Sequence, residues 1–144
     1  MDIETRENIG WDLFGVSGDV ANHDYSGTGK RLMDELWRRV RANGLPHKGI
    51  NFWVYDSAVR MFTGVELKDA ANVGDLLEHK PVRIARAAYY KHIGPYHNLA
   101  ETHRVFEREL AAGNLVEIGP RVERYGDWVA DENQAVTEIF IGVK

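Results

Sequence analysis

Hydrophobic and polar residues alternate with a period of two in much of this chain, which is the pattern of β-strands. The stretches that read as strands are 11–20, 50–55, 60–67, 82–90, 120–125 and 135–143. The turn signal Asp56-Ser57 separates the second stretch from the third, so these two are predicted to form a hairpin. Residues 1–10 are polar, and we expect them to be only loosely attached.

Two other segments have the three-to-four spacing of amphipathic helices. One runs from a cap at Ser26 or Thr28 to about Arg41, and the other covers 95–112. Six strands and two long helices predict an α+β fold in which an antiparallel sheet carries both helices on one face. The opposite face of the sheet is then the expected place for a ligand cleft.

The two halves of the chain resemble each other when the numbering is shifted by 70. The matching pairs include Leu36 with Phe106, Val40 with Leu110, Gly49 with Gly119 and Tyr55 with Tyr125. A helix stripe, its stop and the start of the next strand therefore recur in one register. The length of 144 residues predicts a single domain, 1–144, and the recurrence predicts that it is built from two copies of a strand-helix-strand-strand unit at about 11–68 and 81–144.

Composition narrows the possible functions. The chain has no cysteine, which excludes disulfides, thiolate catalysis and cysteine–zinc sites. The formal net charge is −4 and no basic tract is present, so direct binding of nucleic acid is not expected. No apolar run approaches the ~20 residues that span a bilayer, and the first residues lack the features of a signal peptide. We expect a cytoplasmic protein that needs neither membrane nor cofactor.

The last predicted strand supplies the candidate charged residue. Thr137, Ile139, Ile141 and Val143 form its natural helix-facing side, which leaves Glu138 between Val136 and Phe140 on the other side. Glu138 is either an ordinary solvated residue of an exposed sheet face or the acidic residue of a pocket.

Aromatic residues are the second candidate feature, because the chain has four Trp and six Tyr. Trp53 and Tyr55 share one face of their strand, Tyr125 is the equivalent of Tyr55, and of Tyr89 and Tyr90 only one can join them. Such rings either fill the core or line a pocket for a planar ligand. A carboxylate among them would select a cation, and burial would raise its pKa, which also suits a general acid. Binding and catalysis both remain open.

Two weaker signals are rejected. His97 and His103 are six residues apart and fall on opposite faces of a helix, so no metal site is predicted. Gly27-Thr28-Gly29-Lys30-Arg31 resembles part of a phosphate-binding loop. It lacks the first glycine, and Arg31 stands where a Ser or Thr would bind magnesium.

Three segments resemble the gyrase-inhibitor-like (GyrI-like) small-molecule-binding family, which includes effector-binding domains of AraC- and MerR-type regulators. They are Tyr90 to Leu99 with His92-Ile-Gly-Pro-Tyr96, Gly119-Pro120 followed by Glu123-Arg-Tyr125, and Thr137-Glu-Ile-Phe-Ile141. The duplicated unit is also similar to that family. The sequence departs from the family pattern at Ser57, Trp128 and Gly142, which are turn and edge positions.

The resemblance implies a cleft between the two halves that binds bulky, often cationic aromatic compounds. The acidic pocket residue would be Glu138, and the aromatic wall Trp53, Tyr55, Tyr90 and Tyr125, with Phe140 beside the glutamate. Some members of the family resemble hydrolases that open cyclopropane-bearing alkylating toxins.

Three functions follow as hypotheses. The first is stand-alone binding of a hydrophobic, cationic aromatic molecule for sensing or sequestration. The second is hydrolysis of a cyclopropane-type toxin in the same pocket, with Glu138 as the acid–base residue. The third is inhibition of a larger enzyme, such as a gyrase, with that protein as partner. Because the first strand begins at about Trp11, we expect no DNA-binding helix-turn-helix.

Overall fold

The structure is a computed structural model that describes residues 1–144. Its elements are β1 (Glu4–Asp19), α1 (Tyr25–Ala42), β2 (His47–Ser57), β3 (Arg60–Leu67), β4 (Glu78–Ile93), the short 3₁₀ helix η1 (Tyr96–Asn98), α2 (Leu99–Ala112), β5 (Glu117–Tyr125), the short 3₁₀ helix η2 (Glu132–Gln134) and β6 (Val136–Val143). The predicted α+β fold with an antiparallel sheet and two helices is confirmed.

The ends of several elements differ from the prediction. Residues 1–10 were expected to be loose, but β1 includes them from Glu4 onward, and Glu4 pairs with Tyr89 of β4. Helix α1 begins at Tyr25 because the cap is Asp24, whose carboxylate accepts a hydrogen bond of 3.0 Å from the Gly27 amide. Polar residues in a strand hide its period of two, so a paired but solvent-facing segment such as 4–10 is easily missed.

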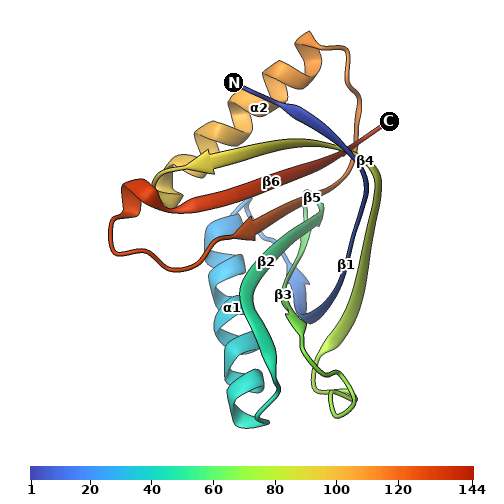
Figure 1. The fold of residues 1–144 in the computed structure, drawn as a ribbon, viewed down its shortest axis with the longest axis vertical. Coiled ribbons are helices and arrows are strands. Elements are labelled where there is room, and N and C mark those ends of the chain that lie inside the picture. The colour runs from blue at the N-terminus through green and yellow to red at the C-terminus, as the bar shows by residue number, and fades with distance from the viewer.

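The sheet is closed into a barrel with the strand order β1-β3-β2-β5-β6-β4, and every neighbouring pair is antiparallel. Both helices lie outside the barrel (Figure 1). Helix α1 packs on β1 and β3, and α2 packs on β4. The central strands β2 and β5 therefore lie between the areas that the two helices cover.

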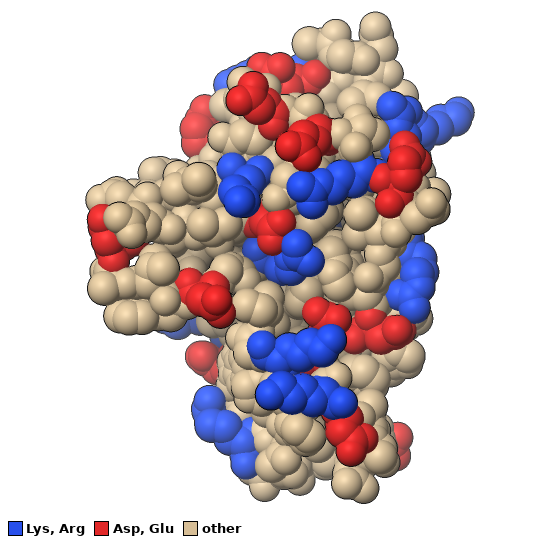
Figure 2. All heavy atoms as spheres, in the orientation of Figure 1, with Lys and Arg blue, Asp and Glu red and all other residues tan.

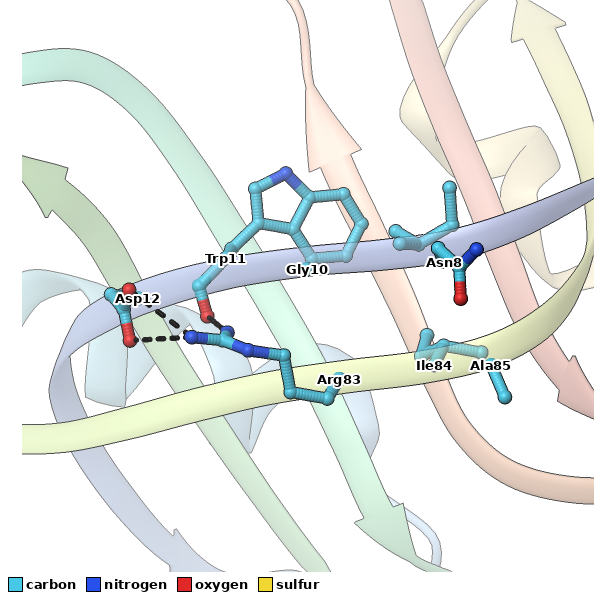
Figure 3. A pocket seen from close by; sticks show the side chains of 8 residues that line it. Asn8, Gly10, Trp11, Asp12, Arg83, Ile84 and Ala85 are labelled. Atoms are coloured by element: carbon cyan, nitrogen blue, oxygen red, sulfur yellow. Dashed lines mark hydrogen bonds and ion pairs between the residues drawn. The ribbon is translucent and has the colours of Figure 1, made fainter.

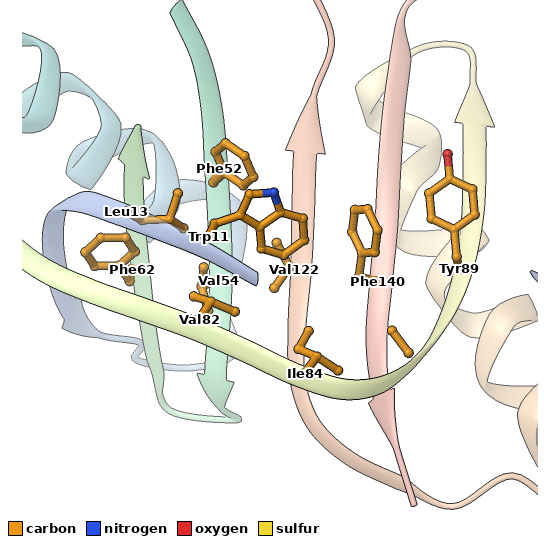
Figure 4. Close-up of a cluster of buried hydrophobic side chains, with 11 residues drawn as sticks. Trp11, Leu13, Phe52, Val54, Phe62, Val82, Ile84, Tyr89, Val122 and Phe140 are labelled. Carbon is orange, nitrogen blue, oxygen red and sulfur yellow. The ribbon is translucent and has the colours of Figure 1, made fainter. Parts of the chain in front are cut away.

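The face of the sheet opposite the helices is the interior of this barrel. It is filled by eleven buried side chains (Figure 4): Trp11, Leu13, Phe52, Val54, Phe62, Val82, Ile84, Ala87, Tyr89, Val122 and Phe140. We expected a ligand cleft on this face, but closure of the sheet makes it a buried apolar core. Burial of these side chains is a main source of stability, at about 25 cal/mol per Å² of apolar surface.

Two smaller buried clusters lie between the barrel and the helices. One joins α1 to the first half of the chain through Leu32, Leu36 and Val40. The other joins α2 to the second half through Phe106 and Leu110. In β6, Ile139, Ile141 and Val143 face α2, as the alternation predicted.

The long strands β1 and β4 belong to both halves (Figure 1). Each changes its inward face along the way. In β4, Ile84 and Ala87 both point into the barrel although they are three residues apart. In β1 the change occurs beside Asn8, which has a φ of 54°. One end of each strand therefore packs with the first half of the chain and the other end packs with the second half.

Backbone details recur at the same spacing of 70 as the sequence. Gly44 and Asn114 both have a φ of 58°, and Gly49 and Gly119 also have positive φ. The register shift of β2 against β3 between His47 and Asn51 returns in β5 against β6 between Glu117 and Arg121. The two units therefore share their turn chemistry as well as their order of elements.

Candidate functional site

A buried carboxylate, Glu123, lies on the helix-facing side of the central strands. Its position in β5 is directly opposite Trp53 of β2 and Ile139 of β6. Only 2% of Glu123 is exposed. Buried carboxylates are rare unless they are paired, so its partners define what this position can do.

Three side chains contact the Glu123 carboxylate. The hydroxyls of Tyr55 and Tyr125 both donate to Oε1, the latter at 2.9 Å. His103 of α2 contacts Oε2 through Nε2 at 3.1 Å. Burial, followed by the charge of Glu123, raises the pKa of both tyrosines well above the usual value. Both phenols therefore remain protonated donors at neutral pH.

The orientation of His103 is set from its other side by Arg121. The guanidinium Nη1 of Arg121 lies 3.3 Å from Nδ1 of His103. Since a guanidinium only donates, Nδ1 accepts and Nε2 carries the proton that points at Glu123. Arg121 is itself held by Glu107 at 2.8 Å and Glu117 at 2.7 Å. Two carboxylates thus pair with the Arg121 guanidinium, and the third, Glu123, lies on the far side of His103.

Aromatic rings surround the same carboxylate. The ring of Trp53 lies edge-on to that of Tyr125, with centroids 5.6 Å apart, and the ring of Tyr96 also lies edge-on to Tyr125 at the same distance. Trp53 also packs against Gly29 of α1, where no side chain intervenes. The rings of Trp53 and Tyr125 are half-buried, and Tyr96 is exposed. We call Glu123, Trp53, Tyr55, Tyr125, His103 and Tyr96 the Glu123 site.

The structure separates the residues that the sequence grouped together. Trp53, Tyr55 and Tyr125 come together as predicted. Glu138, however, is opposite Arg124 in the β5–β6 register, on the other face of the sheet, so its expected place among these rings was wrong. Phe140 is on that same face and lies in the barrel interior.

Tyr90 lies on the helix-facing side but away from the Glu123 site. Tyr90 is in β4, opposite Ile139 of β6, and β6 separates it from β5, which carries Glu123. Its ring packs edge-on against Phe106 of α2. Of the two adjacent tyrosines, neither therefore joins the rings around Glu123.

Glu138 is bound by residues of its own face. Its Oε2 accepts a hydrogen bond of 2.6 Å from the Tyr89 hydroxyl, and its Oε1 accepts one of 2.8 Å from Arg124. We expected burial to raise the pKa of Glu138. Burial does act in that direction, but the hydrogen bonds from Tyr89 and Arg124 and the positive charge outweigh it, so the pKa is lowered. An Arg partner already neutralises this carboxylate.

Sequence reasoning missed Glu123 and His103 as site residues. A signal for Glu123 was present, because it lies two residues before Tyr125 and so shares its face of the strand. It is also the equivalent of Trp53 at the spacing of 70. No comparable signal marked His103, whose role depends on how α2 is docked.

The two main hollows of the surface lie elsewhere. The larger, of about 680 Å³, lies along the paired strands β1 and β4, and it is lined by Asn8, Ile9, Gly10, Trp11, Asp12, Arg83, Ile84 and Ala85 (Figure 3). Arg83 extends along it and donates to the Trp11 carbonyl at 2.7 Å and to Asp12 at 3.1 Å. The charged groups of this hollow, Arg83 and Asp12, are thus paired with each other, and we regard the Arg83 contacts as a structural link between β4 and β1.

The second hollow, of about 370 Å³, includes Ser17, Arg39 and Glu78 and is likewise remote from the Glu123 site. Neither helix is long and apolar enough to cross a membrane.

Comparison with known proteins gives matches in structure but not in sequence. No protein-family model matches the chain, and no curated protein matches it in sequence. Among solved structures, SAV2435 bound to tetraphenylphosphonium superposes with a TM-score of 0.65 at 15% identity, over 100% of this chain and 94% of that chain.

Two further structures extend the likeness. The C-terminal domain of EcmrR gives a TM-score of 0.77 at 16% identity, over 99% of this chain and 97% of that domain. In the EcmrR–DNA complex the same likeness covers 57% of the EcmrR chain. A hydrolase from Listeria innocua matches with a TM-score of 0.57 at 11% identity, over 99% of this chain and 91% of that chain. At these identities the likeness concerns the fold, and the chain has the GyrI-like fold that the sequence resemblance predicted.

Proposed function

We propose that the chain binds a bulky organic cation at the Glu123 site, for sensing or sequestration. The observation that carries this proposal is the buried Glu123 carboxylate among half-buried aromatic rings. A cation stacked on these rings gains cation–π attraction, at about 0.5–2 kcal/mol for each good contact. It also gains attraction to Glu123, which acts through a medium that screens charge less than water does.

The arrangement of donors supports binding of a cation that remains intact. Tyr55, Tyr125 and His103 all donate to Glu123, so three hydrogen-bond partners hold the carboxylate in place and it is not free to move toward a substrate. Glu107 and Glu117 add negative charge beyond Arg121. The likeness in fold to SAV2435, which binds tetraphenylphosphonium, is consistent with this ligand class.

Calorimetric titration with tetraphenylphosphonium tests the proposal. We expect binding by the unmodified chain and at least a tenfold loss of affinity in Glu123→Gln, because the amide keeps the shape but removes the charge. Glu138→Gln is the matched control and should bind as the unmodified chain does. The neutral triphenylphosphine oxide should bind weakly to all three proteins. Equal affinity of Glu123→Gln and the unmodified chain for the cation would exclude this site.

Glu123→Gln could act by disturbing the fold, so a second variant is needed. Trp53→Leu keeps an apolar side chain but removes the aromatic face. It should lower the affinity for tetraphenylphosphonium without affecting the weak binding of triphenylphosphine oxide. Urea unfolding of each variant shows whether the folded state is retained.

A hydrolase remains the second candidate, favoured by the hydrogen-bonded series His103, Glu123 and Tyr55, which combines a carboxylate with two proton-bearing groups. A hydrolase should turn over an activated cyclopropane, and Glu123→Gln should then lower the rate more than the affinity. A binding protein should return the compound unchanged.

A further inference from the structure

We propose that the ligand site extends outward to Trp128, which forms an outer subsite for the apolar part of a large cation. This inference rests on the proposed function and adds a size preference to it. Trp128 is 85% exposed, and its neighbour Val129 is also exposed. Single exposed aliphatic side chains are common, but an indole this exposed leaves a large apolar area in water.

A series of packed rings begins next to the buried carboxylate, and Trp128 lies a short distance from it along the chain. The series runs from Trp53 to Tyr125 and from Tyr125 to Tyr96, with each pair of centroids 5.6 Å apart. Trp128 follows Tyr125 by three residues, in the loop between β5 and β6. Exposure increases along the series, from buried Glu123 through half-buried Tyr125 to Tyr96 at 51% and Trp128 at 85%.

The loop that carries Trp128 is fixed at both ends but free in its middle. The Gly126 amide donates to the Val136 carbonyl at 2.8 Å, and the Gln134 amide donates to the Asp131 carbonyl at 2.9 Å. Between them, residues 127–130 make no backbone hydrogen bond within the chain. The indole can therefore adjust to a ligand at Tyr125 without breaking secondary structure.

The charge of the loop favours the same ligand class. Residues 126–134 include Asp127, Asp131 and Glu132 and no Lys or Arg. In Figure 2 the projecting edge where Figure 1 places this loop shows mostly uncharged atoms with acidic side chains among them. An exposed indole in a negative loop attracts cations with large apolar groups, through both ring contact and charge.

The ligand class that follows is a cation with several bulky apolar or aromatic groups. One part of such a molecule lies against the rings near Glu123, while another contacts Trp128. A small cation of the same charge uses the inner part alone. Trp128 should therefore determine the preference for size and have no effect on the attraction to charge.

The test compares tetraphenylphosphonium, titrated directly, with tetramethylammonium, measured by its ability to displace the larger cation. We expect Trp128→Ala to lower the affinity for tetraphenylphosphonium about five- to tenfold, which corresponds to the loss of one ring contact. The apparent affinity of tetramethylammonium should stay within twofold, and Trp128→Phe should restore most of the binding. Ile118→Ala, which removes an exposed apolar side chain at the other end of β5, should change neither.

The outcomes distinguish this inference from the proposed function. If Glu123→Gln loses the larger cation while Trp128→Ala binds it as the unmodified chain does, the outer subsite is absent and the inner site stands. Equal losses for both cations in Trp128→Ala would also overturn the size preference. If the unmodified chain binds neither cation, the proposed function fails and the subsite fails with it.

Discussion

Trp53 and Glu123 lie directly opposite each other on β2 and β5, and they are also equivalent positions of the two units, since their numbers differ by 70. A residue that pairs with its own equivalent lies on the pseudo-twofold axis, so this axis passes between the indole and the carboxylate. The first unit supplies the apolar Trp53 and the second unit supplies the charged Glu123. The two equivalent positions at the centre of the fold therefore carry chemically different side chains.

The two tyrosines beside this pair should stabilise the fold through Glu123. Tyr55→Phe and Tyr125→Phe each remove one hydrogen bond to a buried carboxylate, and we expect each to lower the free energy of unfolding by about 1–3 kcal/mol. Because both hydroxyls donate to the same oxygen, the double variant should lose an amount different from the sum. Urea unfolding measures all three values.

Tyr90→Phe is the control for these variants, because Tyr90 is held through its ring against Phe106 and lies away from Glu123. The free energy of unfolding of Tyr90→Phe should differ from that of the unmodified chain by less than about 0.5 kcal/mol. If Tyr55→Phe were no more harmful than Tyr90→Phe, the Tyr55 hydroxyl would contribute nothing to holding the carboxylate.

The fold could be predicted from the sequence because its main signals are local. Short apolar or alternating stretches marked the six strands, and amphipathic spacing marked helices that end at about Arg41 and at residue 112, close to the observed ends at Ala42 and Ala112. Closure of the sheet was not predictable in this way, because it depends on the pairing of β1 with both β3 and β4. The face that an open sheet would expose is therefore inside the barrel.

The same limit explains why the site was only partly predicted. Periodicity groups Trp53 with Tyr55 within one strand, but it does not tell which face of β6 meets that group. Phe52 and Val54, which are purely apolar, occupy the barrel interior, while Trp53 and Tyr55 face outward, where the Tyr55 hydroxyl donates to Glu123. Glu138 shares the inward face, so the wrong carboxylate was assigned to the rings.

Glu138 should make stability depend on acidity. Because its pKa is lowered in the folded chain, its contribution is present above the ordinary glutamate pKa of about 4.3 and is lost as pH falls through the folded value. Glu138→Gln should therefore lose less stability than the unmodified chain between neutral pH and about pH 3. Urea midpoints across this range test the difference.

Glu109→Gln, at an exposed position of α2, is the matched control for that comparison. It should follow the pH profile of the unmodified chain. Parallel profiles for Glu138→Gln and the unmodified chain would show that the contacts with Tyr89 and Arg124 do not lower the pKa of Glu138.

Tyr89 should give a dependence at the alkaline end. Burial, together with the hydrogen bond to Glu138 and its charge, raises the pKa of Tyr89 to about 12. The unfolded chain releases this proton near the ordinary value of about 10, so the contribution of Tyr89 is intact below that pH and is lost as pH rises through about 12. Tyr89→Phe should show a shallower alkaline loss of stability. In an alkaline titration followed by phenolate absorbance, this variant should also lack one tyrosine that ionises above the ordinary pKa. A titration curve equal to that of the unmodified chain would contradict the raised pKa of Tyr89.

Gly29 of α1 should be required for the position of Trp53. Alanine in place of glycine inside a helix normally stabilises by about 1 kcal/mol. Here an added Cβ would lie 2.7 Å from Cε3 of Trp53 and closer still to other ring atoms, so the ring must move. We expect Gly29→Ala to lower the free energy of unfolding by about 1–3 kcal/mol and to weaken cation binding. In the background of Trp53→Leu the same substitution should regain the helix benefit, because the ring is gone. Unfolding of the four proteins of this double-mutant cycle measures the coupling, and equal effects in both backgrounds would show that the two residues do not interact.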